Sequence, residues 1–475
     1  MIASSSDLIA VLRRYNPWWS GGRVQGLPSW RRAVFRDIRS WLDSPPGGRA
    51  LLVSGARQTG KTTLLLQAIE ELLAQGAQPE SILYVTLDHP LFKLVGLDAL
   101  LDLWQDLAPR HGGVEYLFLD EIQAAKDWQV WLKHQVDFRK NLRIAVTGSA
   151  TPLATDAVES GVGRWQTVRL ATLSFYEYLK IRREPVDFIP ELPSLAVLFQ
   201  RPESWFMHVA EAARPLVGHF HDYLLRGGFP QSALISDIAL AQKLLREDIV
   251  DKVLKRDMTA QYGVRRVIEL EQTFLYLCLH DGGLLDMQTL CGALEVKKPT
   301  AGGFIDLLEA THLIYRLRPF GYGKEVLRGK SKIYLADPAI APAVMLRGRE
   351  LLEDAALLGQ VVECAFFKHV FSRYYQHSIS FSYWRGKKDL EVDIVADIGG
   401  RLVPFEVKYR GARVGAAELR GLARFCEERG VSRCYAVTRD AADFGLLPLG
   451  AGGVTALKIP AALACFWLGQ SEVAD

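Results

Sequence analysis

The chain has 475 residues, of which 49% are hydrophobic and 23% charged, an ordinary composition for a globular protein with room for about three domains. A formal net charge of +3 is too small to indicate a nucleic-acid-binding protein by itself, so any such surface has to be a local patch. The six cysteines are scattered without a CxxC pair, which excludes a zinc site of the usual spacing and indicates a reducing compartment.

Short apolar runs alternate with amphipathic stretches over residues 1–180, which predicts an α/β domain with a parallel sheet and crossover helices. The predicted strands are 49–55, 81–88, 114–121, 142–149 and 166–170. The prolines of 183–204 indicate an insertion, so residues 181–260 are assigned to an insertion followed by helices. Two further domains are expected over residues 261–350 and 355–475.

A phosphate-binding loop is predicted where the sequence reads GARQTGKT, between the first strand and a helix. In such a loop the backbone N–H groups surround the phosphates, Lys61 reaches the β and γ phosphates, and Thr62 holds Mg²⁺. ATP and Mg²⁺ are therefore the expected cofactors. The predicted nucleotide contacts are Gly55, Ala56, Arg57, Gln58, Thr59, Gly60, Lys61, Thr62 and Thr63.

Acids and hydroxyls follow the next strands of the predicted sheet. Asp120 and Glu121 end the third strand, where Asp120 is predicted to bind the magnesium through water and Glu121 to orient the attacking water. Thr147 and Ser149 end the fourth strand, where a hydroxyl can contact the γ-phosphate or that water; a polar strand end without a role is the alternative.

These motifs, with RRYNPWW (13–19), LSFYEYL (173–179) and LRGGFP (225–230), resemble those of a prokaryotic family of predicted AAA+ ATPases. The resemblance implies an AAA+ core over 1–180, a helical lid over 181–260, and a sensor role for Thr147 and Ser149. It also implies that Arg164 reaches the nucleotide of a neighbouring subunit in a homo-oligomer such as a hexameric ring, although a surface arginine is equally expected.

The same resemblance places LRGGFP in the lid near the adenine. Arg226 is then expected to be a second sensor, and Pro230 is expected to lie beside the nucleotide. A turn that ends a helix explains the glycines and the proline of this motif equally well.

Residues 284–335 read as two amphipathic helices followed by two strands around a basic loop, the pattern of a winged helix-turn-helix. The basic residues are Lys297 and Lys298 before the second helix, and Lys324, Arg328, Lys330 and Lys332 in the loop. Their positive charge predicts contact with a DNA backbone. Protein contact through the same fold is the alternative.

Residues 389–409 are expected to form a hairpin that turns at Gly399-Gly400, so that paired positions sum to 799. One face of this hairpin is apolar, and the other gathers Glu391, Asp393, Glu406 and Lys408. Like charges repel across strands, so the acids need a compensating partner.

Glu363 lies on the apolar stripe of the preceding helix and also needs a partner. Magnesium, or manganese, shared by Glu363, Asp393 and Glu406 would satisfy all three acids. Lys408 could then position or deprotonate a water.

The predicted order of elements in this region is helix, three strands, helix and strand, over 357–375, 377–385, 390–398, 401–409, 415–430 and 433–439. This order resembles the PD-(D/E)XK nuclease fold, which implies a restriction-endonuclease-like α/β domain. Asp393 matches the metal-binding Asp of that motif and Glu406-Val407-Lys408 its ExK, whereas no proline precedes Asp393. A degenerate nuclease fold kept for DNA binding or assembly is the alternative.

The chain is therefore predicted to be an ATPase that binds and remodels DNA, such as branched or broken DNA and Holliday junctions in recombination or repair, with or without metal-dependent cleavage. The alternative is a nucleotide-dependent oligomeric switch in regulation or defence, with a non-catalytic nuclease-like domain. The sequence shows no signal peptide and no apolar run near roughly 18 residues. A cytoplasmic, nucleoid-associated protein without a membrane partner is expected.

Overall fold

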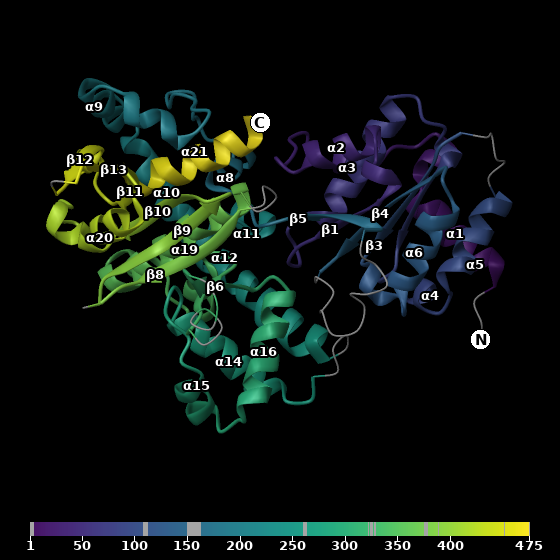
Figure 1. The fold of residues 1–475 in the computed structure, drawn as a ribbon. Helices are drawn as coiled ribbons and strands as arrows, with labels where there is room; N and C mark the ends of the chain where they lie inside the picture. Colours follow the sequence, from purple (N-terminus) through teal and green to yellow (C-terminus); the bar gives the residue numbers. More distant parts are fainter. Residues whose placement is uncertain are drawn as a thin grey trace. The chain divides into compact units, whose positions relative to one another are not determined.

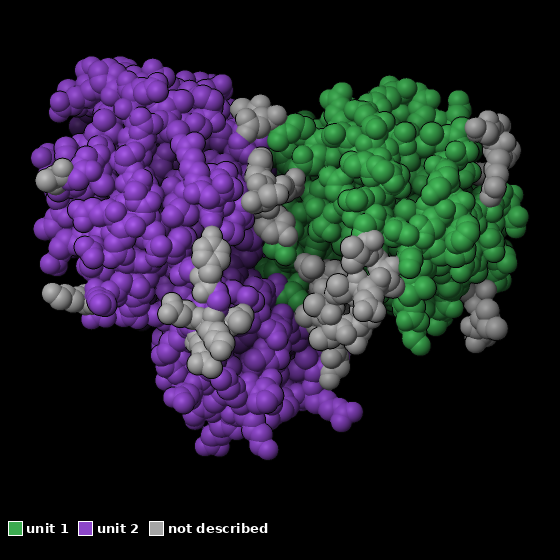
Figure 2. Space-filling model, in the orientation of Figure 1, with its two compact units in different colours: residues 1–170, 310–312 green, residues 171–309, 313–475 purple. Residues whose placement is uncertain are grey.

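The computed structural model describes residues 4–107, 113–149, 163–259, 264–321, 323, 326, 329–374, 379–387, 389–450 and 452–474. The chain forms two compact units (Figures 1 and 2). Unit 1 comprises residues 1–170 and 310–312, and unit 2 comprises residues 171–309 and 313–475. The four-part division expected from the sequence is finer than these two units and stays a prediction. None of the described helices has the length and hydropathy needed to cross a membrane.

Unit 1 is built on a five-stranded sheet in the order β2-β3-β4-β1-β5, with parallel pairing throughout. Its strands are β1 (Ala50–Ser54), β2 (Ile82–Thr86), β3 (Glu115–Asp120), β4 (Leu142–Gly148) and β5 (Trp165–Arg169). Its helices are α1 (Ser5–Tyr15), α2 (Phe35–Asp43), α3 (Lys61–Ala74), α4 (Pro90–Lys93), α5 (Leu97–Leu107) and α6 (Trp128–Phe138). The parallel α/β sheet predicted for this region is confirmed.

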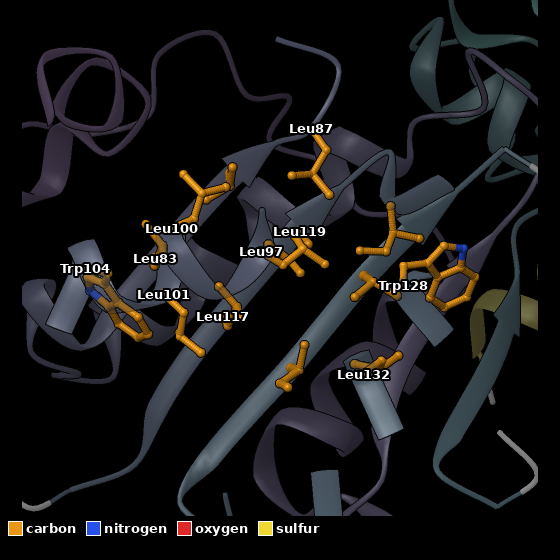
Figure 3. Close-up of a cluster of buried hydrophobic side chains, with 14 of the residues drawn as sticks. Leu83, Leu87, Leu97, Leu100, Leu101, Trp104, Leu117, Leu119, Trp128 and Leu132 are labelled. Atoms are coloured by element: carbon orange, nitrogen blue, oxygen red, sulfur yellow. The ribbon is translucent and has the colours of Figure 1, made fainter. Parts of the chain in front are cut away.

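Two apolar clusters cover the two faces of this sheet, because successive strand residues point to opposite faces. Leu117 belongs to the cluster with Trp104 of α5 and Trp128 of α6, as Figure 3 shows. The next residue, Phe118, belongs to the cluster that α2 and α3 complete. A parallel sheet covered on both faces reads as continuous apolar runs, which is why its strands could be found in the sequence.

The segment after α1 covers the edge strand β2. The Asn16 side chain donates to the Tyr84 carbonyl (2.9 Å) and accepts from the Tyr84 N–H (2.7 Å). The indole N–H groups of Trp18 and Trp19 both donate to the Ile82 carbonyl, at 3.1 and 2.9 Å. These side chains therefore satisfy backbone groups that an edge strand would leave unpaired, which gives the NPWW part of the motif a structural role.

Unit 2 contains an eight-stranded sheet in the order β12-β13-β11-β10-β9-β8-β6-β7. Its strands are β6 (Ile314–Pro319), β7 (Lys332–Leu335), β8 (Ser380–Arg385), β9 (Glu391–Ile398), β10 (Arg401–Lys408), β11 (Arg433–Thr438), β12 (Gly445–Leu449) and β13 (Val454–Pro460). Its α-helices are α8 (Phe175–Ile181), α9 (Glu203–Ala212), α10 (Arg214–Arg226), α11 (Pro230–Leu234), α12 (Ile238–Arg246), α14 (Val267–Leu279), α15 (Met287–Leu294), α16 (Lys298–Ala310), α18 (Ile340–Val344), α19 (Ala355–Tyr374), α20 (Arg420–Arg429) and α21 (Ala461–Ala474). A π-helical segment, Glu247–Asp257, follows α12.

The helices α14 to α16 and the antiparallel strands β6 and β7 follow the order that a winged helix requires, with a further bridge between Leu284 and Lys332. However, β6 also pairs with β8, so these strands extend the sheet of the C-terminal region. The winged helix stays a prediction. The placement of Lys332 in a basic loop is wrong, because this residue lies in β7 and is only 3% exposed. Lys324 and Arg328 lie outside the described residues.

The hairpin expected around Gly399-Gly400 is present as β9 and β10. Arg401 pairs with Ile398 and Phe405 with Ile394, so the predicted register is confirmed over Arg401 to Phe405. Both turn glycines have positive φ, at 60° and 92°, as a two-residue hairpin turn requires. The predicted helix, three strands, helix and strand correspond to α19, β8, β9, β10, α20 and β11. The sequence-based interpretation missed β12, β13 and α21.

Candidate functional site

The predicted phosphate-binding loop joins the end of β1 at Ser54 to the start of α3 at Lys61. Gly55 has no room for a side chain, because a Cβ atom there would lie 2.3 Å from the Leu170 carbonyl oxygen. The first glycine of the motif is therefore required by the close approach of the chain after β5. The loop stands at the carboxyl end of the central strand, where open α/β sheets bind their ligands.

Lys61 is buried within this loop, with 4% of its surface exposed. Its ammonium donates to the carbonyls of Gly55 (3.0 Å) and Ala56 (2.9 Å). Burial lowers the pKa of Lys61, and the charges of Glu121 and Asp120 oppose that shift. The ammonium is thus held over the loop by neutral acceptors, and a phosphate would offer it stronger, charged ones.

Asp120 lies at the centre of a hydrogen-bond network below the loop. Thr62 donates to its Oδ2 (2.7 Å), Tyr84 donates to the same oxygen (3.1 Å), and Thr147 donates to Oδ1. Burial raises the pKa of Asp120, whereas these hydroxyl donors lower it. The pairing of Thr62 with Asp120 fits a Mg²⁺ bound beside a nucleotide, since both side chains offer the oxygen ligands that this ion prefers.

Glu121 follows directly, in a left-handed backbone conformation with φ at 57°. Its N–H donates to the Thr147 hydroxyl (2.9 Å), and its carboxylate accepts from the Gln123 amide, which also donates to Ser149 (2.8 Å). A positive φ at a non-glycine residue costs about 1–3 kcal/mol and is typical of functional sites. The structure thus brings Glu121, Thr147 and Ser149 together at the ends of β3 and β4.

Tyr84, Gln123 and His312 are neighbours of this site that the sequence analysis did not identify. His312, in the segment that returns to unit 1, shares a hydrogen bond with Ser54 (2.8 Å) at the base of the loop. Burial lowers the pKa of His312 to about 3, and the charges of Arg169 and Lys61 act in the same direction. No local sequence motif indicates that His312 lies at the loop, because it is 258 positions from Ser54 in the sequence.

Arg164 lies at the other end of the sheet from the loop. It precedes Trp165, which pairs with Ala50 at the start of β1, so the length of β1 separates it from the loop by about 13 Å. Its guanidinium forms an ion pair with Asp137 (2.7 Å). An action of Arg164 on a nucleotide in a neighbouring subunit stays a prediction.

Arg226 is 5% exposed and its side chain contacts other groups of unit 2. It donates to the carbonyls of Ile235 (2.9 Å) and Ser236 (2.6 Å) and pairs with Asp222 (3.0 Å). These contacts support a structural role, and the predicted sensor role is untested. Pro230 is the first residue of α11, where a proline is well suited to a helix start.

The LRGGFP motif contributes to a buried polar junction in unit 2. Asp337 accepts from the Gly228 N–H (2.9 Å) and from Thr172 (2.6 Å), and Lys368 donates to Leu173. Beside it, His369 Nε2 accepts from the Phe175 N–H (2.7 Å) while its Nδ1 donates to Ala365 (2.6 Å). Burial lowers the pKa of His369 to about 3, and the Lys368 charge contributes.

Two of the acids predicted to share a metal, Glu363 and Asp393, lie around Lys332 together with Glu391. The Lys332 ammonium lies 2.7 Å from Glu363 Oε1, 2.9 Å from Asp393 Oδ1 and 3.2 Å from Glu391 Oε1. Lys408 pairs with Glu406, whose other carboxylate oxygen is buried without a hydrogen-bond partner. Within the ranges that the structure describes, no group of three or more His, Cys, Asp or Glu side chains is arranged to hold a metal ion.

The two lysines lower the pKa of Asp393, whereas burial and the Asp393 charge raise the pKa values of Glu363 and Glu406. Burial raises the pKa of Asp393, but Lys332 and Lys408 outweigh it and hold the pKa below its usual range. Burial and the Asp393 charge raise the pKa of Glu406 to about 8. Glu363 and Asp393 come together as expected from the sequence, whereas Glu406 pairs with Lys408. The geometry does not fit the predicted magnesium or manganese, because an ammonium takes the position that Glu363 and Asp393 share.

Comparison with protein families separates the chain into three matched stretches. Residues 47–179 match a model described as an AAA domain. Residues 217–351 and 358–461 match two models that are each described as a domain of unknown function.

Curated relatives match the chain at low identity. A Haemophilus influenzae protein described as uncharacterized is 26% identical over 295 residues, covering 60% of this chain and 66% of that protein. The uncharacterized protein MJ1544 of Methanocaldococcus jannaschii is 22% identical over 292 residues, covering 60% of each. The matched stretch thus spans slightly less than two thirds of both relatives.

Solved structures with similarity include AMPPCP-bound DnaA from Aquifex aeolicus, with 17% identity, a TM-score of 0.25, and coverage of 58% of this chain and 86% of that chain. A DNA polymerase III gamma subunit-related protein from Thermotoga maritima has 13% identity, a TM-score of 0.27, and coverage of 58% and 97%. TM-scores this low carry no argument about function. The loop geometry and the family match together show that the chain carries a P-loop ATPase domain of the AAA type over residues 47–179.

Proposed function

We propose that this chain is an ATP-hydrolysing AAA+ protein that works as a homo-oligomer and acts on DNA through unit 2. The observation that carries the ATPase part is the hydrogen-bonded set of Thr62, Asp120 and Thr147 directly below the loop, with Glu121 at its edge. This set supports hydrolysis as well as binding, because it includes a carboxylate for the attacking water.

In the proposed reaction, Lys61 leaves the loop carbonyls and donates to the β and γ phosphates. Thr62 and Asp120 would hold a magnesium ion, which would neutralise charge on the phosphates. Glu121 accepts a hydrogen bond from the attacking water and orients it towards the γ-phosphate. Gln123 and Thr147 hold the Glu121 carboxylate and backbone in position.

Arg164 is proposed to complete the site of a neighbouring copy. Its position at the start of β5, beyond reach of its own loop, supports an action in trans and therefore an oligomer. The guanidinium would exchange Asp137 for the γ-phosphate, whose oxygens suit its planar donors.

DNA is proposed as the substrate of unit 2, including branched or broken DNA of the kind that recombination and repair process. Lys297 and Lys298 are exposed at the start of α16, and Lys330 is exposed next to β7. This charge supports contact with a phosphate backbone. Metal-dependent cleavage is not part of this proposal, because Lys332 takes the position that the metal would need.

A second candidate is a nucleotide-dependent oligomeric switch with a non-catalytic nuclease-like domain. The engagement of Glu363 and Asp393 by Lys332 favours this candidate, since it leaves the C-terminal region without the predicted cleavage centre. Slow, DNA-independent hydrolysis together with nucleotide-dependent assembly would support the switch.

The discriminating experiment measures phosphate release by the full chain with single-stranded, duplex and four-way-junction DNA. Lys297→Ala/Lys298→Ala is the test variant, and Lys243→Ala/Arg246→Ala, which removes two exposed charges of α12, is its charge-matched control. Stimulation by DNA that the double variant loses and the control keeps supports the DNA proposal. Hydrolysis that no DNA changes would contradict it and leave the switch.

A further inference from the structure

A buried ammonium stands at the centre of the acid cluster of unit 2. Lys332 is 3% exposed, and the three acids around it come from two elements: Glu363 from α19, and Glu391 and Asp393 from β9. The three N–H donors of an ammonium match these three carboxylates one to one. The distances of 2.7–3.2 Å are those of N–H···O hydrogen bonds.

The lysine reaches this position from the backbone of a strand. Lys332 begins β7, pairs with Leu317 of β6, and bridges Leu284 on its other side. Two residues along the same strand, Tyr334 donates to Glu363 Oε1 (2.7 Å). Since residues i and i+2 of a strand share a face, β7 presents both a cation and a hydroxyl to the cluster.

The remaining donors around the acids are also protein groups. The Val407 N–H donates to the second oxygen of Asp393 (2.8 Å), and Lys408 pairs with Glu406. Burial lowers the pKa of Lys332, but the Asp393 and Glu363 charges outweigh it and hold that pKa well above its usual value. The lysine therefore remains charged.

A divalent metal at the shared position would need oxygen ligands at about 2.0–2.6 Å. It would have to occupy the space of the ammonium or lie directly beside its positive charge. Glu363 Oε1 and Asp393 Oδ1, the two oxygens that such a metal would use, are the ones that accept from Lys332.

We propose that Lys332 is the resident cation of this cluster, and that the cluster holds no divalent metal in the native protein. The ammonium joins β7, α19 and β9 into one body and so links the predicted winged-helix region to the C-terminal sheet. The acids that resemble a nuclease motif thereby serve assembly. This inference is independent of the proposed ATPase and DNA functions.

The test compares Mn²⁺ binding, followed by the loss of the free-ion electron paramagnetic resonance signal, in nucleotide-free full-length protein. The variants are Lys332→Met, Lys332→Met/Asp393→Asn and Asp393→Asn. Lys330→Met is the matched control, because Lys330 is exposed and pairs only with Asp286 among the described residues. Subtracting the Asp393→Asn signal removes any binding at the phosphate loop.

We expect wild type and Lys330→Met to bind the same amount of Mn²⁺ as Asp393→Asn binds. Lys332→Met is expected to gain one site, and the double variant to lose it. A wild-type site that disappears in Asp393→Asn would overturn the proposal. Folded Lys332→Met that gains no site would overturn the view that the ammonium stands in the place of a metal.

A second measurement keeps the proposal testable if Lys332→Met does not fold. The melting temperatures of wild type and Asp393→Asn are expected to shift by the same amount between Mn²⁺ and a chelator, since any binding at the phosphate loop is common to both proteins. A wild-type melting temperature that falls in chelator, with no such fall in Asp393→Asn, would contradict a resident lysine.

Discussion

Removing the Thr147 hydroxyl should slow ATP hydrolysis while leaving nucleotide binding intact. This hydroxyl donates to Asp120 and accepts from the Glu121 N–H (2.9 Å), so it aligns both acids of the site. Thr147→Val keeps the volume of the side chain but leaves two buried polar groups without their partner. Each such loss costs about 1–3 kcal/mol.

If the loss of the hydroxyl raises the activation free energy of hydrolysis by about 1–3 kcal/mol, kcat falls by roughly 5-fold to 150-fold. The assay is steady-state phosphate release, with the affinity for a fluorescent ATP analogue measured in parallel. Thr147→Ser is the matched control, because it keeps the hydroxyl and loses only a methyl group.

Turnover of Thr147→Val within about twofold of wild type would refute the alignment argument. So would an equal loss in Thr147→Ser, since the effect would then come from packing rather than from the hydroxyl.

Three further predictions concern the other parts of the site and the junction of unit 2. Glu121→Gln should bind ATP with near wild-type affinity but lose most turnover, about 100-fold or more, as measured by nucleotide retention after gel filtration. Arg164→Ala should also bind ATP without hydrolysing it, and mixing it with Glu121→Gln subunits should restore some phosphate release; a mixture without activity would count against an action in trans. His369 has a pKa of about 3 in the folded protein against about 6.5 unfolded, so the unfolded chain binds more protons between these values and stability falls as the pH drops below about 6.5. At pH 5 this loss is about 2 kcal/mol, and urea unfolding of wild type and His369→Gln should show a weaker pH dependence in the variant.

The ATPase sheet could be predicted because each of its signals lies within a short stretch of the sequence. The strands β1, β2 and β4 are short apolar runs that are almost wholly buried, and the loop motif fixes the order of β1 and α3. The acids at the end of β3 were identified for the same reason. Tyr84 and Gln123 were missed, because their contacts with Asp120 and Glu121 depend on which strands are neighbours.

The acid cluster could be predicted only in part. Strand alternation and the glycine turn gave the hairpin register and placed Asp393 near Glu406. Lys332 was assigned to a basic loop because it follows Lys330 in a polar stretch, and its partner Asp393 lies 61 positions away. Similarly, α21 has no amphipathic pattern to mark it, since its residues from Ala461 to Leu468 are all buried.

The most direct test of the central claim is phosphate release from ATP by purified full-length protein and by Lys61→Ala, measured side by side. Lys61 is the group that the loop holds ready for the phosphates, so wild type should hydrolyse ATP and Lys61→Ala should lose both hydrolysis and nucleotide binding. Equal phosphate release by the two proteins, or none by wild type with Mg²⁺ and DNA present, would contradict the account.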